Sequence, residues 1–297
     1  MAISEPISTE MTKRAKTGGI GRVLKEFPII PVLILATVIF CAFFGNYIAP
    51  KNPRKYVLGN SFAPPVWYEK GSRENLLGTD NMGRDIFSRL IAGASISATV
   101  AFIAICIAGF IGVCVGLTSG YAGGRVDAVL MRVVDVQLSI PYILLALLMV
   151  AVLGASLRNV IIVIGFAGWP GYARVVRGEV LSIKSRDFVA LARVLGCGRL
   201  RIMFRHVLPQ VINTLIILAT LQVGTTMIFE ASLSFLGLGV QPPTPSWGLM
   251  LADGRNYLSS AWWISAFPGL IILFTCLSAN LMGDWFRDKF DPKLRQL

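Results

Sequence analysis

The amino-acid sequence predicts an all-α integral membrane protein with about six transmembrane helices. Hydrophobic residues make up 55% of the 297-residue chain and charged residues only 15%, whereas soluble domains carry roughly 25% charged residues. The apolar residues also fall in long uncharged blocks, and a helix needs roughly 20 such residues to cross a hydrocarbon core of ~30 Å. Both observations favour a membrane protein over a soluble domain.

Uncharged blocks recur along the chain at the length of transmembrane spans, or close to it. The first is expected to be an uncleaved anchor, because no A-x-A-like cleavage site follows it. The second is long enough to include a loop. The fourth is the shortest, and its flanking residues Arg158 and Arg174 can extend it by reaching toward the interface. In chain order the blocks cover residues 27–50, 90–124, 136–157, 159–173, 207–229 and 256–283.

The distribution of Lys and Arg sets the expected orientation, because basic residues concentrate in cytoplasmic loops. They cluster before the first block, between the fourth and fifth, and after the sixth. Six spans put these three basic regions on the same side of the membrane. The net charge of +12 therefore indicates an excess of Lys and Arg on the cytoplasmic side rather than nucleic-acid binding. We expect a cytoplasmic segment 1–26, a transmembrane domain 27–283 and a cytoplasmic tail 284–297. Within the domain we expect outer loops at about 50–89 and 237–261, and a cytoplasmic loop at about 174–208.

Local signals mark structure outside the spans. Three prolines between residues 241 and 245 cannot continue a helix, so residues 237–254 are expected to form a loop. Before the second block, Thr79 or Asp80 is expected to cap a short amphipathic helix. The apolar face of that helix consists of Ile86, Phe87, Leu90 and Ile91.

Several classes of active site are excluded by the sequence. The motif G-x-x-x-x-G-K-[ST] is absent, so the chain has no P-loop for ATP. The nucleophile motif G-x-S-x-G is also absent, and a single histidine, His206, rules out H-E-x-x-H. The five cysteines include no C-x-x-C pair, so neither a disulfide framework nor a structural zinc site is expected. We therefore assign no catalytic residue, metal or cofactor to this chain.

Four glycines of the second block, Gly112, Gly116, Gly120 and Gly124, recur at every fourth residue. Such a ridge of small residues lets a neighbouring helix approach closely. Ordinary packing of the helix bundle is the expected role. A helix contact that moves during transport is the alternative.

The segment 184–209, KSRDFVALARVLGCGRLRIMFRHVLP, predicts a basic helix-turn-helix on the cytoplasmic face. Ser185 or Asp187 can begin the first helix, and Gly196 with Gly198 breaks it. A second segment follows, with apolar side chains among arginines. The residues alone leave two roles open, which are binding of anionic lipid at the membrane surface and docking of a partner protein.

This segment resembles the EAA loop of ABC-importer permeases, whose pattern is E-A-A-x3-G-x9-I-x-L-P. The resemblance implies that the loop couples the permease to its ATPase. Ala192, Gly196, Leu208 and Pro209 match the pattern, whereas Ala190, Leu191 and His206 depart from it. The residues assigned to the ATPase-coupling loop are Asp187, Ala190, Leu191, Ala192, Arg193, Gly196, Leu208 and Pro209.

Three further stretches, 76–94, 231–251 and 280–294, are similar to the C-type permease of dipeptide, oligopeptide and nickel importers. In this family two permeases form a heterodimer in the bacterial inner membrane, two ATPase subunits dock on their cytoplasmic loops, and an extracytoplasmic binding protein delivers the solute. The resemblance implies a type I ABC importer fold and passage of peptides or a related solute such as a nickel chelate. ATP and Mg would be held by the partner ATPases, so this chain is expected to be a transport subunit and not an enzyme.

Polar residues within the blocks are candidates for lining a translocation pathway, although each can equally bond a neighbouring helix. Glu230 is expected near the outer interface, as a hydrated helix end, an ion pair with an outer-loop arginine or a residue of the outer mouth. The alternative function is a self-contained secondary transporter or channel, which would show midspan charges or paired broken helices. The pathway candidates are Gln137, Gln222, Thr226 and Glu230.

Overall fold

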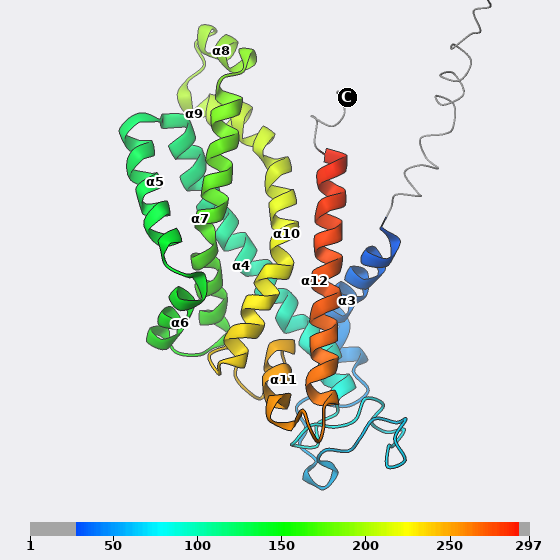
Figure 1. Cartoon of the computed structure of the whole chain (residues 1–297). Coiled ribbons are helices and arrows are strands. Elements are labelled where there is room, and N and C mark those ends of the chain that lie inside the picture. Colours follow the sequence, from blue (N-terminus) through cyan, green and yellow to red (C-terminus); the bar gives the residue numbers. More distant parts are fainter. Residues whose placement is uncertain (1–27, 291–297) are drawn as a thin grey trace, which may run out of the picture.

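The computed structural model describes residues 28–290, and helices form its regular structure, apart from one isolated bridge between Thr79 and Asp85 (Figure 1). A π-helical turn, Met203–Val207, joins α9 to α10. The α-helices are α3 (Ile29–Ile48), α4 (Ile86–Ala122), α5 (Gly124–Ser139), α6 (Tyr142–Leu153), α7 (Leu157–Lys184), α8 (Asp187–Val194), α9 (Arg199–Ile202), α10 (Leu208–Phe235), α11 (Trp247–Gly254) and α12 (Trp263–Phe290).

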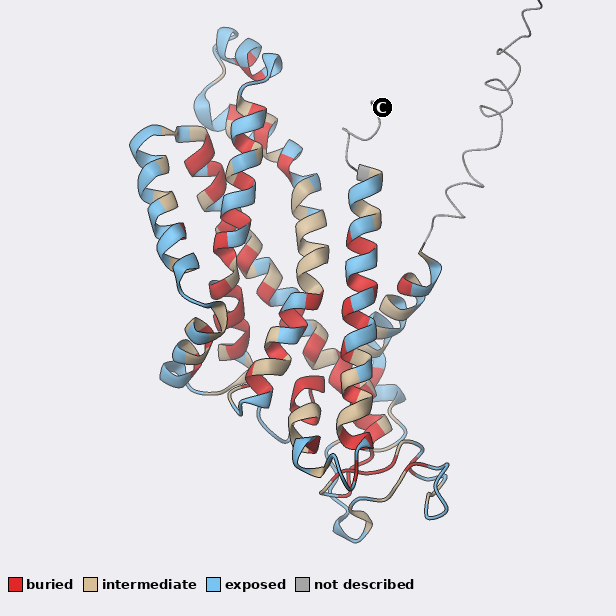
Figure 2. Ribbon diagram, viewed as in Figure 1, coloured by how far each residue is buried: buried red, intermediate tan, exposed pale blue. Residues whose placement is uncertain are grey.

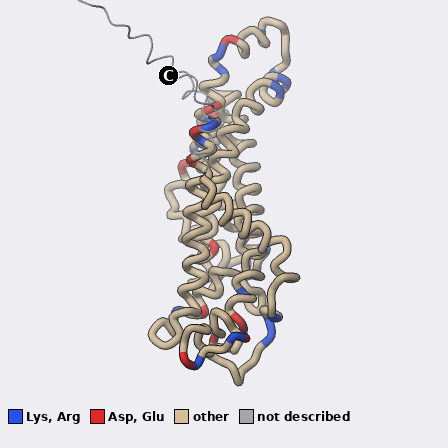
Figure 3. Tube along the Cα trace, turned by 90° about the vertical axis from the view of Figure 1, so that its right-hand side faces the viewer, with Lys and Arg blue, Asp and Glu red and all other residues tan. Residues whose placement is uncertain are grey.

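The long helices run between two ends of the molecule (Figure 1). We call these the α8 end, toward which α12 ends, and the α11 end, which also carries the loop before α4. Five of the described helical stretches are long and apolar enough to cross a membrane, and the bent pair α5–α6 brings the number to six. Lys, Arg, Asp and Glu gather toward the two ends (Figure 3). The predicted all-α architecture with about six spans is confirmed.

The third span is broken, and the expectation of one uncharged span over 136–157 is wrong. Helix α5 ends at Ser139, α6 begins at Tyr142, and their axes differ by 88°. Pro141 causes the break, because proline lacks an N–H and disfavours the helical conformation in the residue before it. Ile140 accordingly has an extended backbone, with φ −89° and ψ 125°.

Helix α4 is continuous for 37 residues, roughly 55 Å at 1.5 Å per residue. The expected loop within 90–124 and the separate short helix before it are therefore wrong. Asp85, not Thr79 or Asp80, caps the helix, since its carboxylate accepts the Ser88 N–H at 2.9 Å. The apolar face around Ile86 forms the first turn of the long helix, and it is buried against the α11 end.

Helices α4 and α7 pack closely because glycines line their contact. A methyl group at Gly116 would lie 2.8 Å from Cβ of Val176, and one at Gly120 would lie 2.8 Å from Cβ of Val180. Their backbones therefore approach in a way that side chains would prevent. The expected packing role of this ridge is confirmed, except at Gly124, which has a positive φ of 56° and open space around it.

A short helix occupies the second half of the expected loop 237–254. Ser246 caps α11 by accepting the Leu249 N–H at 3.2 Å. Trp247 then enters the core, where its indole N–H donates to the Leu90 carbonyl at 2.9 Å. Helix α10 ends at Phe235, before the prolines, in a turn where the Leu238 N–H donates to the Leu233 carbonyl. The prolines lie in the loop as expected, but burial of Trp247 stabilises a helix directly after them.

Burial divides the molecule into a packed interior and an apolar exterior (Figure 2). Separate apolar clusters stabilise the α11 end, the α6–α7 region and the α8 end. Exposed apolar side chains cover α3, and Phe43 is 75% exposed. Such a surface fits hydrocarbon rather than water.

Candidate functional site

The helix-turn-helix at the α8 end is closed by a glycine turn. Gly196 has a φ of +75°, which a residue with a side chain rarely adopts. Its N–H donates to the Arg193 carbonyl at 3.0 Å, and the Cys197 N–H donates to the Ala192 carbonyl at 3.0 Å. This pair of bonds is the Schellman motif, which satisfies the last carbonyls of α8. The chain then enters α9 and runs through the π-helical turn into α10 without a further break.

The α8–α9 segment has one buried face and one exposed apolar face. Val189 and Ala192 pack with Ile202 into the apolar cluster at the α8 end. The exposed apolar side chains are Phe188, Leu191, Val194, Leu195, Leu200 and Phe204. Of the residues assigned to coupling, Ala192 is buried and Leu208 half-buried, whereas Asp187, Ala190, Leu191, Arg193, Gly196 and Pro209 are exposed.

Ionic contacts anchor the base of this segment to the bundle. Arg177 of α7 donates two hydrogen bonds to the Asp127 carboxylate of α5, each 2.6 Å long. Ser119 at the end of α4 bonds the same carboxylate. Lys184, the last residue of α7, donates to the Tyr121 carbonyl at 2.6 Å. The segment therefore projects from a firmly joined end of α4, α5 and α7.

A cavity of ≈ 280 Å³ lies among α4, α6, α7 and α10. Two of the pathway candidates, Gln222 and Thr226, line it, whereas Gln137 and Glu230 do not. No Asp, Glu, Lys, Arg or His is among its lining residues. The polar lining groups are Tyr142, Tyr172, Gln222, Thr225 and Thr226, and the others are Ala104, Ile105, Ala108, Leu138, Ile164, Ala167, Gly168, Gly171 and Phe229.

Gln137 bonds the backbone of α7 instead. Pro170 lies inside α7 and has no N–H, so the carbonyl of Phe166, four residues earlier, has no helical partner. The side-chain amide of Gln137 donates to that carbonyl at 3.0 Å, with a longer contact of 3.5 Å to Ala167. Gln137 thus joins α5 to α7 at the proline, and its pathway role stays a prediction.

Glu230 lies in α10 and is only 1% exposed. Its carboxylate accepts hydrogen bonds from Ser234 at 2.9 Å and from Ser246, just before α11, at 3.0 Å. The expectations of a hydrated helix end and of an ion pair with an outer-loop arginine are wrong, because α11 folds back over this position. Glu230 joins α10 to α11 in this structure, and a role at the outer mouth stays a prediction.

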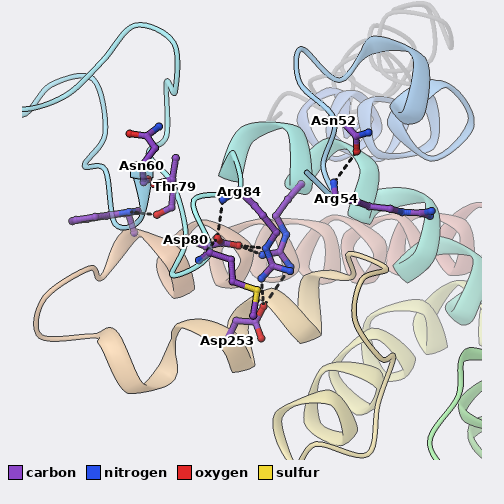
Figure 4. Close-up of polar contacts among 10 residues, drawn as sticks. Asn52, Arg54, Asn60, Thr79, Asp80, Arg84 and Asp253 are labelled. Atoms are coloured by element: carbon purple, nitrogen blue, oxygen red, sulfur yellow. Dashed lines mark hydrogen bonds and ion pairs between the residues drawn. The ribbon is translucent and has the colours of Figure 1, made fainter. Parts of the chain in front are cut away.

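A buried ionic cluster joins the loop before α4 to α11 (Figure 4). Arg84 contacts Asp80 at 2.6 Å and Asp253 at 3.1 Å. Arg89 contacts the same two carboxylates. Two positive and two negative side chains therefore balance one another at the α11 end, three of them almost fully buried. Asp80, Arg84 and Arg89 thus join the stretch 76–94 to α11, a contact that the sequence pattern alone did not reveal.

A family model described as "Binding-protein-dependent transport system inner membrane component" matches residues 112–296, more than half of the chain. The matched range contains the α8–α9 segment and all of α5 to α11. This chain belongs to that family. The permease is therefore the multi-pass inner-membrane component of a binding-protein-dependent transporter, and it is not itself an ATPase.

Curated relatives of the permease cover nearly all of it. It is 43% identical to the di/tripeptide transport system permease of Pseudomonas aeruginosa over 89% of this chain and 87% of that protein. It is 45% identical to the dipeptide transport system permease of Escherichia coli K12 over 90% and 89%. The glutathione transport system permease of Pectobacterium atrosepticum is 38% identical over 89% and 86%.

A solved structure supports the fold of the permease. A chain of the MetNI methionine ABC transporter in an inward-facing conformation superposes with a TM-score of 0.57 at 19% identity. The match covers 66% of this permease and 93% of that chain. The expected resemblance to the permease of an ABC importer is therefore confirmed at the level of the fold.

The cavity also contains groups that the sequence analysis left unassigned. Tyr172 and Phe229 lie in apolar blocks without a motif, so only the packing of α7 against α10 brings them to the cavity. Thr225 and Thr226 follow Gln222 by three and four residues, a spacing that puts all three on one face of a helix and is visible in the sequence. The contribution of α7 had no comparable signal.

Proposed function

We propose that this permease forms one half of the translocation pathway of an ATP-driven importer of short peptides. Its relatives at 43–45% identity are permeases of di/tripeptide and dipeptide systems, which supports a short peptide as the solute. The proposed partners are a second homologous permease, two ATP-binding subunits that carry ATP and Mg, and an extracytoplasmic binding protein. No bond is made or broken on this chain.

The α8 end is the cytoplasmic side in this proposal, with both chain termini on that side. Its basic α8–α9 segment docks on an ATPase subunit, and movement of the ATPases is transmitted through α7 and α10. Alternating access then results when these helices move against the second permease. The termini themselves lie outside the described residues 28–290.

The exposed apolar face of the α8–α9 segment is the observation that carries this proposal. Leu191, Val194 and Leu195 are 62%, 84% and 81% exposed. They belong to α8 and its C-terminal cap, and α8 lies at the tip of the molecule (Figure 1). Val189 and Ala192, on the opposite face of α8, pack toward the bundle. A helix that rested on lipid would bury its apolar face toward the membrane, whereas this one presents apolar side chains away from it.

Substitution of Gly196 by Asp tests the docking role. A side chain at this positive φ strains the turn, and the carboxylate places a negative charge among the arginines of this segment. We expect Gly196→Asp to assemble into the membrane but to lose substrate-stimulated ATP hydrolysis and peptide uptake, measured in proteoliposomes that contain all subunits. Gly154→Asp is the matched control, because Gly154 has a φ of +85° and open space at the opposite end.

Normal coupling in Gly196→Asp would refute docking through this segment. Loss of anionic-lipid binding by the same variant, with coupling intact, would assign the segment to the membrane surface instead. Equal loss of coupling in Gly196→Asp and Gly154→Asp would show only that a strained turn damages the fold.

A further inference from the structure

We propose that the cavity among α4, α6, α7 and α10 binds the peptide backbone through neutral hydrogen-bonding groups and does not select the charge of the peptide side chains. This inference rests on the proposed peptide-import function and assigns part of its pathway. The neutral polar side chains of Gln222, Thr225 and Thr226 carry it.

The hydroxyl of Tyr172 is a buried polar group without a partner. Tyr172 is 3% exposed, and its oxygen forms no hydrogen bond within residues 28–290. Buried hydroxyls almost always have a partner, because an unpaired one costs free energy in apolar surroundings. The side chain of Tyr172 lines the cavity, but its oxygen is covered by the protein in this structure, so the ring has to turn before the hydroxyl can bond a solute.

Three polar side chains of α10 face the same space. Thr225 and Thr226 follow Gln222 by three and four residues, so the three side chains lie on one face of the helix. Their side chains form no hydrogen bond with any described residue, unlike Thr220 two residues earlier, which bonds the Ile216 carbonyl at 2.8 Å. A carboxamide both donates and accepts, and hydroxyls do the same. This set therefore matches the N–H and C=O groups of a peptide bond.

Glycines leave room opposite these groups. Gly168 and Gly171 of α7 line the cavity, and a methyl at Gly171 would meet nothing within 4 Å. Thr225 and Gly171 are exposed, so the cavity opens at the surface of this chain. Its volume of ≈ 280 Å³ is slightly below the roughly 300–1,000 Å³ of complete ligand pockets. A second permease packed against this opening would complete the site.

The absence of charge from the lining determines what the cavity can discriminate. A fixed charge in a poorly solvated cavity attracts a solute of opposite sign and repels one of like sign. Glu230 is the acidic residue of α10 in this region, and its carboxylate bonds Ser234 and Ser246 away from the lining. The lining thus provides hydrogen bonds that every peptide can use and no group that distinguishes Lys from Glu side chains.

Introduction of a charge at Gln222 tests this inference. We would measure competitive uptake of Ala-Ala, Ala-Lys and Ala-Glu by proteoliposomes that contain the full transporter and the same binding protein. Gln222→Glu should raise the Ala-Lys to Ala-Glu uptake ratio at least about tenfold over the wild type, and Gln222→Lys should lower it by a similar factor. Gln222→Leu should reduce uptake of all three peptides alike.

Gln241 provides the matched control, because it lies in the loop before α11 and bonds the Gly237 and Gly239 carbonyls outside the cavity. Gln241→Glu and Gln241→Lys should leave the uptake ratio unchanged. An unchanged ratio in both charged Gln222 variants, at wild-type assembly, would overturn the inference while leaving peptide import intact. A wild-type transporter that hydrolyses ATP but takes up none of the three peptides would instead refute the proposed function.

Discussion

Polar side chains inside the apolar helices of the permease differ in whether they have a hydrogen-bond partner. Gln137 bonds the carbonyl freed by Pro170, and Glu230 bonds two serines. Gln222 and the Tyr172 hydroxyl have no partner among the described residues, and both residues lie along the cavity. Because unpaired polar groups are costly in apolar surroundings, Gln137 and Glu230 stabilise the contacts between helices, whereas Gln222 belongs to the cavity that we propose binds the peptide.

Replacement of Gln137 by Leu separates these two roles. The variant leaves the Phe166 carbonyl without a partner next to Pro170, and we expect a loss of about 0.5–2 kcal/mol of stability. Thermal unfolding of the purified complex in detergent would measure that loss. Peptide uptake per assembled complex should stay at the wild-type value.

Gln241→Leu serves as the comparison, since Gln241 lies in an exposed loop. A Gln137→Leu complex with unchanged thermal stability and much reduced uptake would contradict the structural role. It would support Gln137 as a group that contacts the solute.

At the scale of the helices, close contact and breaks determine which elements move together. Glycines of α4 let α7 approach so closely that an added methyl group would overlap with α7, so we expect these two helices to move as a pair. The hydrogen bonds that Arg177 donates to the Asp127 carboxylate join α5 to this pair near the α8 end. The 88° bend after α5 then places α6 across the α11 end rather than along the span.

Addition of one methyl group at Gly116 tests the α4–α7 contact. It would lie 2.5 Å from the Ala173 carbonyl oxygen and 2.8 Å from Val176 Cβ, so Gly116→Ala should destabilise the permease by about 1–3 kcal/mol. Gly109→Ala, on the same helix, meets only Tyr172 at 3.9 Å. It should be neutral or stabilise by up to about 1 kcal/mol. Equal melting temperatures of the two variants would show that the contact is not tight.

The predictability of each element depended on whether its signal was local. Long uncharged blocks predicted the spans, and the Gly196 pattern predicted the turn after α8, because both depend on neighbouring residues. Pro141 lies inside the third block and interrupts the helix there, but the absence of charged residues predicted one continuous span. The burial of Glu230, the helix after Ser246 and the Tyr172 cavity depend on residues far apart in the chain. Sequence spacing carries no information about such contacts.

For the whole molecule, the proposed orientation puts the α8 end in the cytoplasm, and Cys197 reports on it. Cys197 is half-buried in the turn between α8 and α9. After replacement of the other cysteines (Cys41, Cys106, Cys114 and Cys276), a membrane-permeant maleimide should label Cys197 in intact cells. An impermeant maleimide should label it only in inverted vesicles. Labelling of Cys197 in intact cells by the impermeant reagent would show that the α8 end faces outward and would contradict the proposed orientation.

The energy source of uptake tests the central claim most directly, because it separates an ATP-driven permease from a self-contained secondary transporter. The measurement is accumulation of a labelled dipeptide in proteoliposomes that contain the permease and its proposed partner subunits, with binding protein on the outside. We expect accumulation only when ATP and Mg are enclosed with the ATPase subunits, and none when the permease is omitted. Accumulation by the permease alone, driven by a proton or sodium gradient without ATP, would contradict the account.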